Sequence, residues 1–318
     1  MKALVTGVAG FIGSHLATAL LDQGATVVGV DAFTDYYPRP LKERNLDENA
    51  GREGFRFVEA ALQDADLPAL LDGVTHVFHL AAQAGVRKSW GRDFRTYTEN
   101  NVDATQKLLE ACVRRPLHRF VHASSSSVYG DRAAIPMKED ALPQPVSPYG
   151  VTKMAAEQLG YLYHVNYGVP AVAMRYFTVY GPRQRPDMAF NRFIRAALDD
   201  TPITLYGDGE QTRDFTFVAD AVAATVAAGE HGVPGTAYNI GGGARVSMNQ
   251  VLRLIERIAG RPLKVTREDA QKGDMRDTYA DTSLARRDLG FVPAVSLEDG
   301  LQAEYRWLAA SPAPVSHA

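Results

Sequence analysis

The sequence is poor in cysteine, since Cys112 is the only one among 318 residues. A single cysteine excludes an internal disulfide and fits a reducing compartment. Cys112 stands in an apolar stretch with helical spacing, which indicates core packing and not a catalytic thiol. The eight histidines are scattered without the spacing of metal ligands, so no metal site is expected.

Long apolar segments are also lacking. No window reaches the roughly eighteen apolar residues that a membrane-spanning helix needs, and the short apolar start is not a secretory signal. The net charge of −3 gives no electrostatic basis for binding nucleic acid or an anionic membrane. We therefore expect a soluble cytoplasmic protein with neither as a partner.

Short β-branched segments alternate with helical patterns along the first half of the chain. The expected strands are residues 3–6, 26–30, 55–58, 76–80, 119–123 and 171–176, and the expected helices are 11–23, 101–113 and 154–166. This alternation predicts an α/β fold with a doubly wound parallel sheet of the Rossmann type.

After Gly181 the pattern changes, because prolines and glycines interrupt short segments. This predicts a smaller mixed α/β lobe, although residues 218–228 and 237–240 again look like parts of the sheet. We predict a sheet domain over residues 1–176 with return segments near 214–242, and a smaller lobe mainly over 177–318. The tail from Ser311 is expected to be disordered.

A glycine-rich turn joins the first expected strand to the first expected helix. Gly7, Gly10 and Gly13 have the spacing GxxGxxG, and Phe11 and Ile12 begin the helix. Small residues let the backbone approach a pyrophosphate, whose charge the helix N-terminus stabilises. A glycine triplet alone is a weak signal, but its place between strand and helix predicts a dinucleotide site.

Asp31 ends the second expected strand. A carboxylate there accepts hydrogen bonds from ribose hydroxyls and repels a 2′-phosphate, which favours NAD over NADP; the alternative is that Asp31 caps a loop. Leu80 and the small residues Ala81 and Ala82 end the fourth strand, where a dinucleotide needs close packing. Asn101 either holds the backbone near this site or caps a helix.

Tyr149 and Lys153 form the pattern YxxxK near the start of an expected helix. Their spacing places both side chains on one face, one turn apart. An ammonium beside a phenol favours the phenolate, which makes Tyr149 a candidate base near neutral pH. A chance YxxxK on a surface helix is the alternative, and the nucleotide motif together with the serine-rich strand end at residues 122–130 argues against it.

In this order, the motifs resemble the extended short-chain dehydrogenase/reductase family of NAD-dependent sugar-nucleotide epimerases and dehydratases. The resemblance covers essentially the whole chain and implies NAD as cofactor in the sheet domain and a UDP-sugar in the smaller lobe. It implies that Tyr149 is the catalytic base, that Lys153 assists it and also holds the nicotinamide ribose, and that Ser125 binds the reacting sugar oxygen. A homodimer formed through helices 101–113 and 154–166 is implied in the same way.

Within the family, three segments look like those of UDP-glucuronate 4-epimerases: residues 31–37, 79–87 and 175–189. Dehydratases carry Asp-Glu where this chain has Ser126 and Ser127, so dehydration is disfavoured. UDP-galactose 4-epimerases typically have Asn at the position of Thr178.

A uronic acid needs a cation and a hydroxyl for its carboxylate, and we expect Arg185 and Thr178 to supply them. The alternative is that Arg183 and Arg185 solvate a loop or pair with Asp187. The family match implies further substrate contacts. For the charged residues after position 200, the alternative is that each is an ordinary surface ion. These contacts are Val86, Arg87, Ser126, Arg213, Asp274 and Arg276.

One position departs from the family. Ala61 stands where relatives commonly have an aspartate that contacts adenine, so one cofactor contact is expected to be lost. The expected function is NAD-dependent 4-epimerisation of UDP-glucuronate. The alternatives are a UDP-glucuronate decarboxylase, a 4-epimerase of neutral UDP-hexoses, or an NAD-binding scaffold without turnover.

Overall fold

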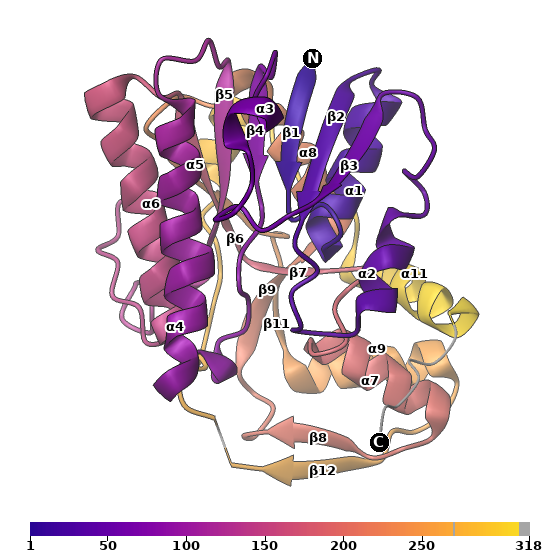
Figure 1. Cartoon of the computed structure of the whole chain (residues 1–318). Helices are drawn as coiled ribbons and strands as arrows, with labels where there is room; N and C mark the ends of the chain where they lie inside the picture. Colours follow the sequence, from indigo (N-terminus) through magenta and orange to yellow (C-terminus); the bar gives the residue numbers. More distant parts are fainter. Residues whose placement is uncertain (270, 312–318) are drawn as a thin grey trace.

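A seven-stranded parallel sheet forms the centre of the computed structural model, which describes residues 1–269 and 271–311 (Figure 1). From one edge to the other its strands are β10 (Ala237–Ile240), β6 (Ala171–Tyr176), β5 (Arg119–Ser125), β4 (His76–His79), β1 (Lys2–Thr6), β2 (Thr26–Asp31) and β3 (Phe55–Glu59). The order reverses between β1 and β4, which leaves a crevice at the carboxyl ends of these strands. The predicted doubly wound α/β class is confirmed.

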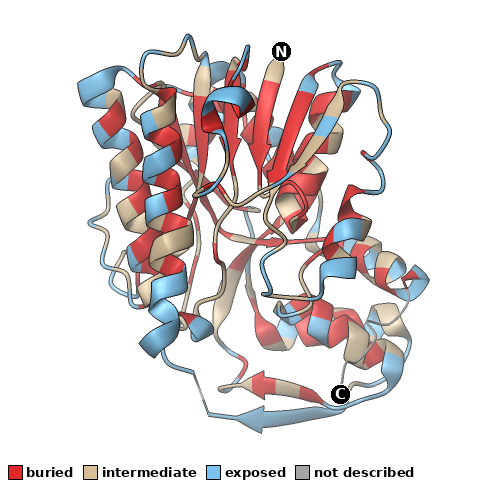
Figure 2. Cartoon of the chain, in the orientation of Figure 1, coloured by how far each residue is buried: buried red, intermediate tan, exposed pale blue. Residues whose placement is uncertain are grey.

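Helices cover both faces of this sheet, as expected for a parallel sheet whose strands are apolar on both sides. One face packs against α1 (Phe11–Asp22), α8 (Val218–His231) and α10 (Ser283–Leu289). The opposite face packs against α3 (Leu67–Leu70), α5 (Ala104–Cys112) and α6 (Pro148–Tyr167). Figure 2 shows the buried strands between the two helical layers. The Cys112 side chain is buried on α5, and burial raises the pKa of its thiol to about 12.

Helix α6 begins at Pro148, earlier than the predicted start at Met154. Proline suits the first position of a helix, because the N–H that it lacks would have no partner there. The Ser147 hydroxyl caps this end and accepts a hydrogen bond of 3.1 Å from the Gly150 amide. Tyr149 and Lys153 therefore lie within the first two turns of α6.

The helix predicted over residues 101–113 is preceded by further helical structure. Helix α4 (Phe94–Tyr97) leads through a π-helical segment, η3 (Thr98–Asp103), into α5. A π-helical turn contains one residue more than an α-helical turn, so it shifts which side chains face the sheet.

The smaller part of the molecule contains two further sheets. One consists of β7 (Thr178–Tyr180), β9 (Thr212–Phe217) and β11 (Arg245–Ser247), and the other of β8 (Ile203–Tyr206) and β12 (Val265–Glu268). A third core joins α7 (Ala189–Asp199), α9 (Met248–Ala259) and α11 (Leu297–Ala310). Helix α2 (Arg39–Leu46) lies next to α1.

The chain returns to the large sheet after its first entry into the smaller part. Helix α8 packs against α1, and β10 pairs with β6 at the sheet edge. Ser311 is buried at the end of α11, and the rest of the tail expected to be disordered lies outside the described residues. Within residues 1–269 and 271–311, no helix is long and apolar enough to cross a membrane.

Candidate functional site

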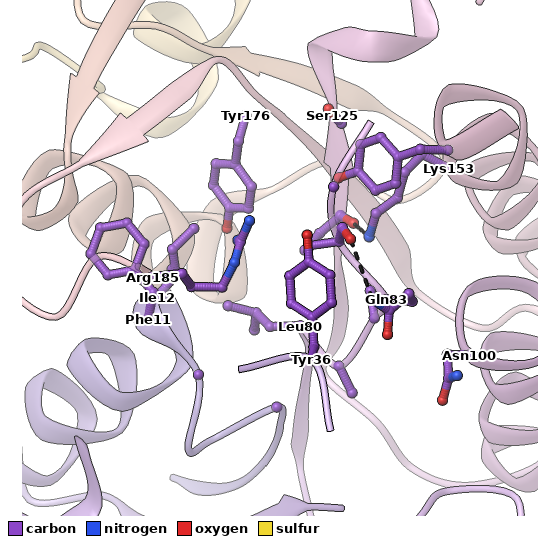
Figure 3. Close-up of a pocket in the computed structure, with 18 of the residues that line it drawn as sticks. Phe11, Ile12, Tyr36, Leu80, Gln83, Asn100, Ser125, Lys153, Tyr176 and Arg185 are labelled. Carbon is purple, nitrogen blue, oxygen red and sulfur yellow. Dashed lines mark hydrogen bonds between the residues drawn. The ribbon is translucent and has the colours of Figure 1, made fainter. Parts of the chain in front are cut away.

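A cleft of about 470 Å³ lies at the carboxyl ends of the central strands, where the strand order reverses (Figure 3). Ligands of doubly wound sheets bind at this place. The predicted site residues that line the cleft are Gly7, Gly10, Phe11, Ile12, Gly13, Asp31, Leu80, Ala81, Ala82, Val86, Ser125, Ser126, Tyr149, Lys153, Thr178, Arg185, Arg213 and Asp274. Three others, Arg87, Asn101 and Arg276, are not among its lining residues.

The glycine turn after β1 needs glycine for steric reasons. Gly7 has φ +71°, and a Cβ there would lie 2.8 Å from the Ala81 amide nitrogen. A Cβ on Gly13 would lie 2.2 Å from the Gly7 carbonyl oxygen. With no side chain in the way, the backbone at the start of α1 faces the cleft, which is the arrangement that accepts a diphosphate.

Asp31 lines the cleft and also holds its own loop, so the alternative of a loop cap is present and the contact with a ribose stays a prediction. Its two carboxylate oxygens accept hydrogen bonds from the amides of Ala9, at 3.0 Å, and Phe33, at 2.9 Å. Burial raises the pKa of Asp31, and these bonds together with the Lys42 charge oppose the rise. A carboxylate has about four acceptor positions, so both oxygens can still accept from a ribose.

Together, the glycine cradle and Asp31 fit a dinucleotide that has a free 2′-hydroxyl. Ala61 also lines the cleft, and its methyl group offers no hydrogen bond. The weaker cofactor contact expected from Ala61 therefore stays a prediction.

Lys153 takes a different orientation from the one its spacing suggested. Its Nζ donates a hydrogen bond of 2.8 Å to the Ala123 carbonyl at the end of β5 and lies 6.0 Å from the centre of the Tyr149 ring. Burial lowers the pKa of Lys153 to about 8. The ammonium is thus directed to the strand and not to the phenolic oxygen.

Burial raises the pKa of Tyr149, and two groups oppose this rise: a hydrogen bond with the Ser125 hydroxyl and the positive charge of Arg185. The Lys153 ammonium is not among the groups that act on the pKa of Tyr149 in this structure, and its expected effect on the base stays a prediction. The effective cation is Arg185, from the opposite side of the cleft.

Ser125 ends β5 in an extended conformation, and its Oγ accepts a hydrogen bond of 3.1 Å from the Ser127 amide. Since that bond uses only acceptor capacity, the hydroxyl proton can point into the cleft. The neighbouring serines lie in the same strand end, where Ser126 and Ser127 also line the cleft.

A buried network fixes this strand end to the middle of α6. The Ser124 hydroxyl donates a hydrogen bond of 2.7 Å to Glu157, whose carboxylate forms an ion pair of 2.6 Å with Arg175 on β6. Arg175 also donates to the Tyr129 hydroxyl at 2.8 Å. Buried ionic groups are tolerated when all their hydrogen bonds are formed, and this network holds Tyr149 and Ser125 in register.

Arg185 lies in the loop between β7 and α7 and points into the cleft, across from Lys153 and Ser125 (Figure 3). It also forms two hydrogen bonds of 3.0 Å with Asp187, so the predicted alternative of such a pair is correct for Arg185 and does not remove it from the cleft. Arg183 is buried and pairs with Glu48 instead. Thr178, the first residue of β7, lines the cleft as well.

Asn101 is buried behind the cleft. Its amide donates to the Gln83 carbonyl at 3.0 Å and to Thr152 at 2.9 Å, and its oxygen accepts from the Gln83 amide at 2.7 Å. Asn100 lines the cleft instead, because the π-helical turn of η3 shifts the register by one residue. The expected hold of Asn101 on nearby backbone is present, and its contact with the cofactor stays a prediction.

The two arginines outside the cleft are engaged elsewhere. Arg87 pairs with Asp274 at 2.7 Å and lies over the Tyr206 ring at 4.2 Å. Arg276 is exposed and pairs with Asp208 at 2.9 Å, so the interpretation as a surface ion describes it correctly here. Arg213 does line the cleft, where its guanidinium donates to the Thr212 carbonyl.

Sequence reasoning missed several lining residues, among them Tyr36, Lys42, Gln83 and Asn100. Tyr36 belongs to a segment that resembled the family, but no spacing rule relates it to Arg185. Within the described ranges, no group of three or more His, Cys, Asp or Glu side chains is placed to hold a metal ion.

A dinucleotide cradle beside a Tyr–Lys–Ser set defines an enzyme of the short-chain dehydrogenase/reductase class. The NAD dependent epimerase/dehydratase family matches residues 3–241, and the chain belongs to this family.

Three proteins that are similar to this chain carry the names of sugar-nucleotide epimerases. One is UDP-glucuronic acid 4-epimerase from Bacillus cereus, whose crystal structure was solved in complex with UDP-glucuronic acid and NAD. Its sequence is 47% identical, and the two structures superpose with a TM-score of 0.95 over 97% of this chain and 99% of that chain. UDP-glucuronate 4-epimerase of Thermodesulfobacterium geofontis is 38% identical over 96% of this chain and 95% of its own. The uncharacterized UDP-glucose epimerase YtcB of Bacillus subtilis is 46% identical over 97% of this chain and 98% of its own.

Proposed function

We propose that the protein is an isomerase, an NAD-dependent 4-epimerase that interconverts UDP-glucuronate and UDP-galacturonate. The observation that carries this proposal is the position of Arg185 in the same cleft as Tyr149 and Ser125. A neutral sugar offers only uncharged hydroxyl oxygens to a guanidinium there, whereas a uronate offers a carboxylate that can form a charged, bidentate pair with it. The similarity to the Bacillus cereus enzyme supports the same assignment.

In this proposal, bound NAD supplies the oxidant for C4 of the sugar and is regenerated in each cycle. The Tyr149 phenolate accepts the proton of the 4-hydroxyl, and the Ser125 hydroxyl donates a hydrogen bond to the same oxygen. Lys153 holds the nicotinamide ribose, while Gly7, Gly10 and Gly13 leave room for the diphosphate. After rotation of the 4-keto sugar, the hydride held by the reduced cofactor would return to the opposite face of C4 and Tyr149 would give the proton back to O4, which inverts C4.

The carboxylate decides between epimerisation and decarboxylation. A 4-keto uronate is a β-keto acid, which loses CO2 when its carboxylate stands perpendicular to the ketone plane. We propose that Arg185 and Thr178 hold the carboxylate away from that geometry. Val86, Ser126, Arg213 and Asp274 supply further substrate contacts in this proposal.

Incubation of the purified protein with UDP-glucuronate tests the function, with the products separated by chromatography. Formation of UDP-galacturonate supports the proposal. A UDP-pentose as the main product would indicate the decarboxylase, and turnover of UDP-glucose without turnover of UDP-glucuronate would indicate a neutral-sugar epimerase such as the name of YtcB implies.

We further propose a homodimer that pairs through α5 and α6. Exposed apolar side chains on α6, namely Tyr161, Leu162, Val165 and Tyr167, support such an interface. The boundary between an NAD-binding domain and the UDP-sugar lobe is proposed after residue 176, with residues 214–242 returning to the first. The single cysteine favours a reducing compartment such as the cytoplasm.

A further inference from the structure

Asp187 holds the Arg185 side chain from one side. Its Oδ1 accepts from Nε and its Oδ2 from one Nη atom, Nη2, each at 3.0 Å. This side-on pair fixes the plane of the guanidinium, because both hydrogen bonds lie in that plane. A guanidinium has five N–H groups, and Nη1 makes no hydrogen bond with the described residues, so this edge remains available to a ligand.

Tyr36 contacts the same carboxylate from another loop. It follows β2 in the loop that begins at Asp31, and its hydroxyl donates a hydrogen bond of 3.2 Å to Oδ2 of Asp187. The Arg185 guanidinium also lies 5.7 Å from the centre of the Tyr36 ring. A residue of the predicted cofactor side thus takes part in orienting a residue of the predicted sugar side.

The backbone of the Arg185 loop is held independently of Asp187. The Gln184 side chain donates to the Val179 carbonyl at 3.2 Å and accepts from the Asn191 amide at 3.0 Å. Asn191 in turn donates to the Gln184 carbonyl at 2.8 Å. Since these three bonds do not involve Asp187, its replacement is expected to free the Arg185 side chain and leave the loop in place.

We propose that Asp187, assisted by Tyr36, is a positioning residue that aims the free edge of Arg185 at the substrate carboxylate and thereby sets the preference for a uronate over a neutral sugar. This inference rests on the proposed function. Asp187 needs no contact with the substrate, because two of the five N–H groups of Arg185 suffice to hold it and the others remain for the ligand.

The test compares the affinities of the NAD-bound protein for UDP-glucuronate and UDP-glucose by titration calorimetry. The variants are Asp187→Ala, Asp187→Asn, which keeps one acceptor oxygen, and Tyr36→Phe. The matched control is Asp200→Ala, since Asp200 forms an exposed ion pair of 2.6 Å with Lys264. Thermal midpoint and bound NAD are measured for every variant.

Asp187→Ala is expected to reduce the preference for UDP-glucuronate by about 10- to 100-fold, the scale on which misplaced positioning groups act. The affinity for UDP-glucose should stay within about twofold, as should that of the control. Asp187→Asn should fall between the wild type and Asp187→Ala. Tyr36→Phe, which removes one hydrogen bond, should lose roughly two- to fivefold.

The positioning role is overturned if the wild type epimerises UDP-glucuronate and both Asp187→Ala and Tyr36→Phe keep its preference for UDP-glucuronate over UDP-glucose. The proposed function would then still stand. If Asp187→Ala proves unstable, Tyr36→Phe alone decides. A wild type that does not turn over UDP-glucuronate overturns both.

Discussion

Lys153 lies one helical turn after Tyr149, yet its Nζ is 6.0 Å from the centre of the Tyr149 ring and donates to the Ala123 carbonyl. Burial raises the pKa of Tyr149, and the positive charge that opposes this rise comes from Arg185. The same arginine is our candidate for binding the substrate carboxylate. In the proposed function, substrate selection and activation of the base therefore converge on one guanidinium.

This dual role predicts a change in pH dependence. Tyr149 acts as a base only when deprotonated, and Arg185 opposes the rise of its pKa caused by burial. Arg185→Ala should raise that pKa and move the ascending limb of kcat/KM to higher pH. The profile is compared with that of Thr178→Ala, which removes the other proposed carboxylate contact and leaves the Arg185 charge in place. An unshifted limb would show that Arg185 does not act on Tyr149.

The buried ammonium of Lys153 predicts a gain of stability on its removal. Burial lowers its pKa from 10.5 to about 8 in the folded state. Between pH 8 and pH 10.5 the unfolded chain keeps the Lys153 proton that the folded chain has released, so the folded state becomes more stable as pH rises through this range. The stability lost by burying the ammonium is recovered in this way. At pH 7 the cost is about 3 kcal/mol at most, partly offset by the bond to Ala123.

Lys153→Met should therefore unfold at a higher urea concentration at pH 7 while losing turnover. The difference from the wild type should shrink above pH 8. Equilibrium unfolding at pH 7 and at pH 10 measures both effects. A variant that is less stable at pH 7 would contradict the inferred burial cost.

Ala61 predicts that the cofactor contact can be strengthened. Ala61→Asp introduces the carboxylate that relatives commonly have, and one hydrogen bond to a charged group should increase NAD affinity about tenfold. Ala61→Asn, which lacks the charge, is the matched control and should gain less. Calorimetric titration of cofactor-stripped protein measures the affinity, and a weaker binding by Ala61→Asp would refute the prediction.

The buried pair of Glu157 and Arg175 predicts a large loss of stability. Glu157→Gln leaves the Arg175 charge buried without its partner, which typically costs about 3–5 kcal/mol. The exposed pair of Asp200 and Lys264 supplies the comparison, since Asp200→Asn should cost less than about 1 kcal/mol. Urea unfolding of the two variants tests this, and similar losses in both would contradict the structural role of the network.

Much of the fold was predictable because each strand and helix is specified locally. The predicted strands 171–176 and 237–240 coincide with β6 and β10. A short apolar segment between two turns leaves little choice of where a strand begins and ends. The start of α6 was missed because Pro148 looks like a break until the Ser147 cap is considered.

Many residues of the site could be predicted from the sequence, but the interactions between their side chains could not. Motif spacing identified Gly7, Asp31 and Tyr149, which all line the cleft. The exchange of Asn100 for Asn101 depends on a π-helical turn that no residue pattern announces. The action of Arg185 on Tyr149 depends on how a loop after β7 folds over the sheet, which is a property of the tertiary structure.

The most direct test of the account uses UDP-glucuronate labelled with deuterium at C4. Transient oxidation at C4, with return of the same hydrogen to the opposite face, predicts UDP-galacturonate that retains the label, as measured by mass spectrometry and NMR. UDP-galacturonate without the label, or a UDP-pentose as the main product, would contradict the account.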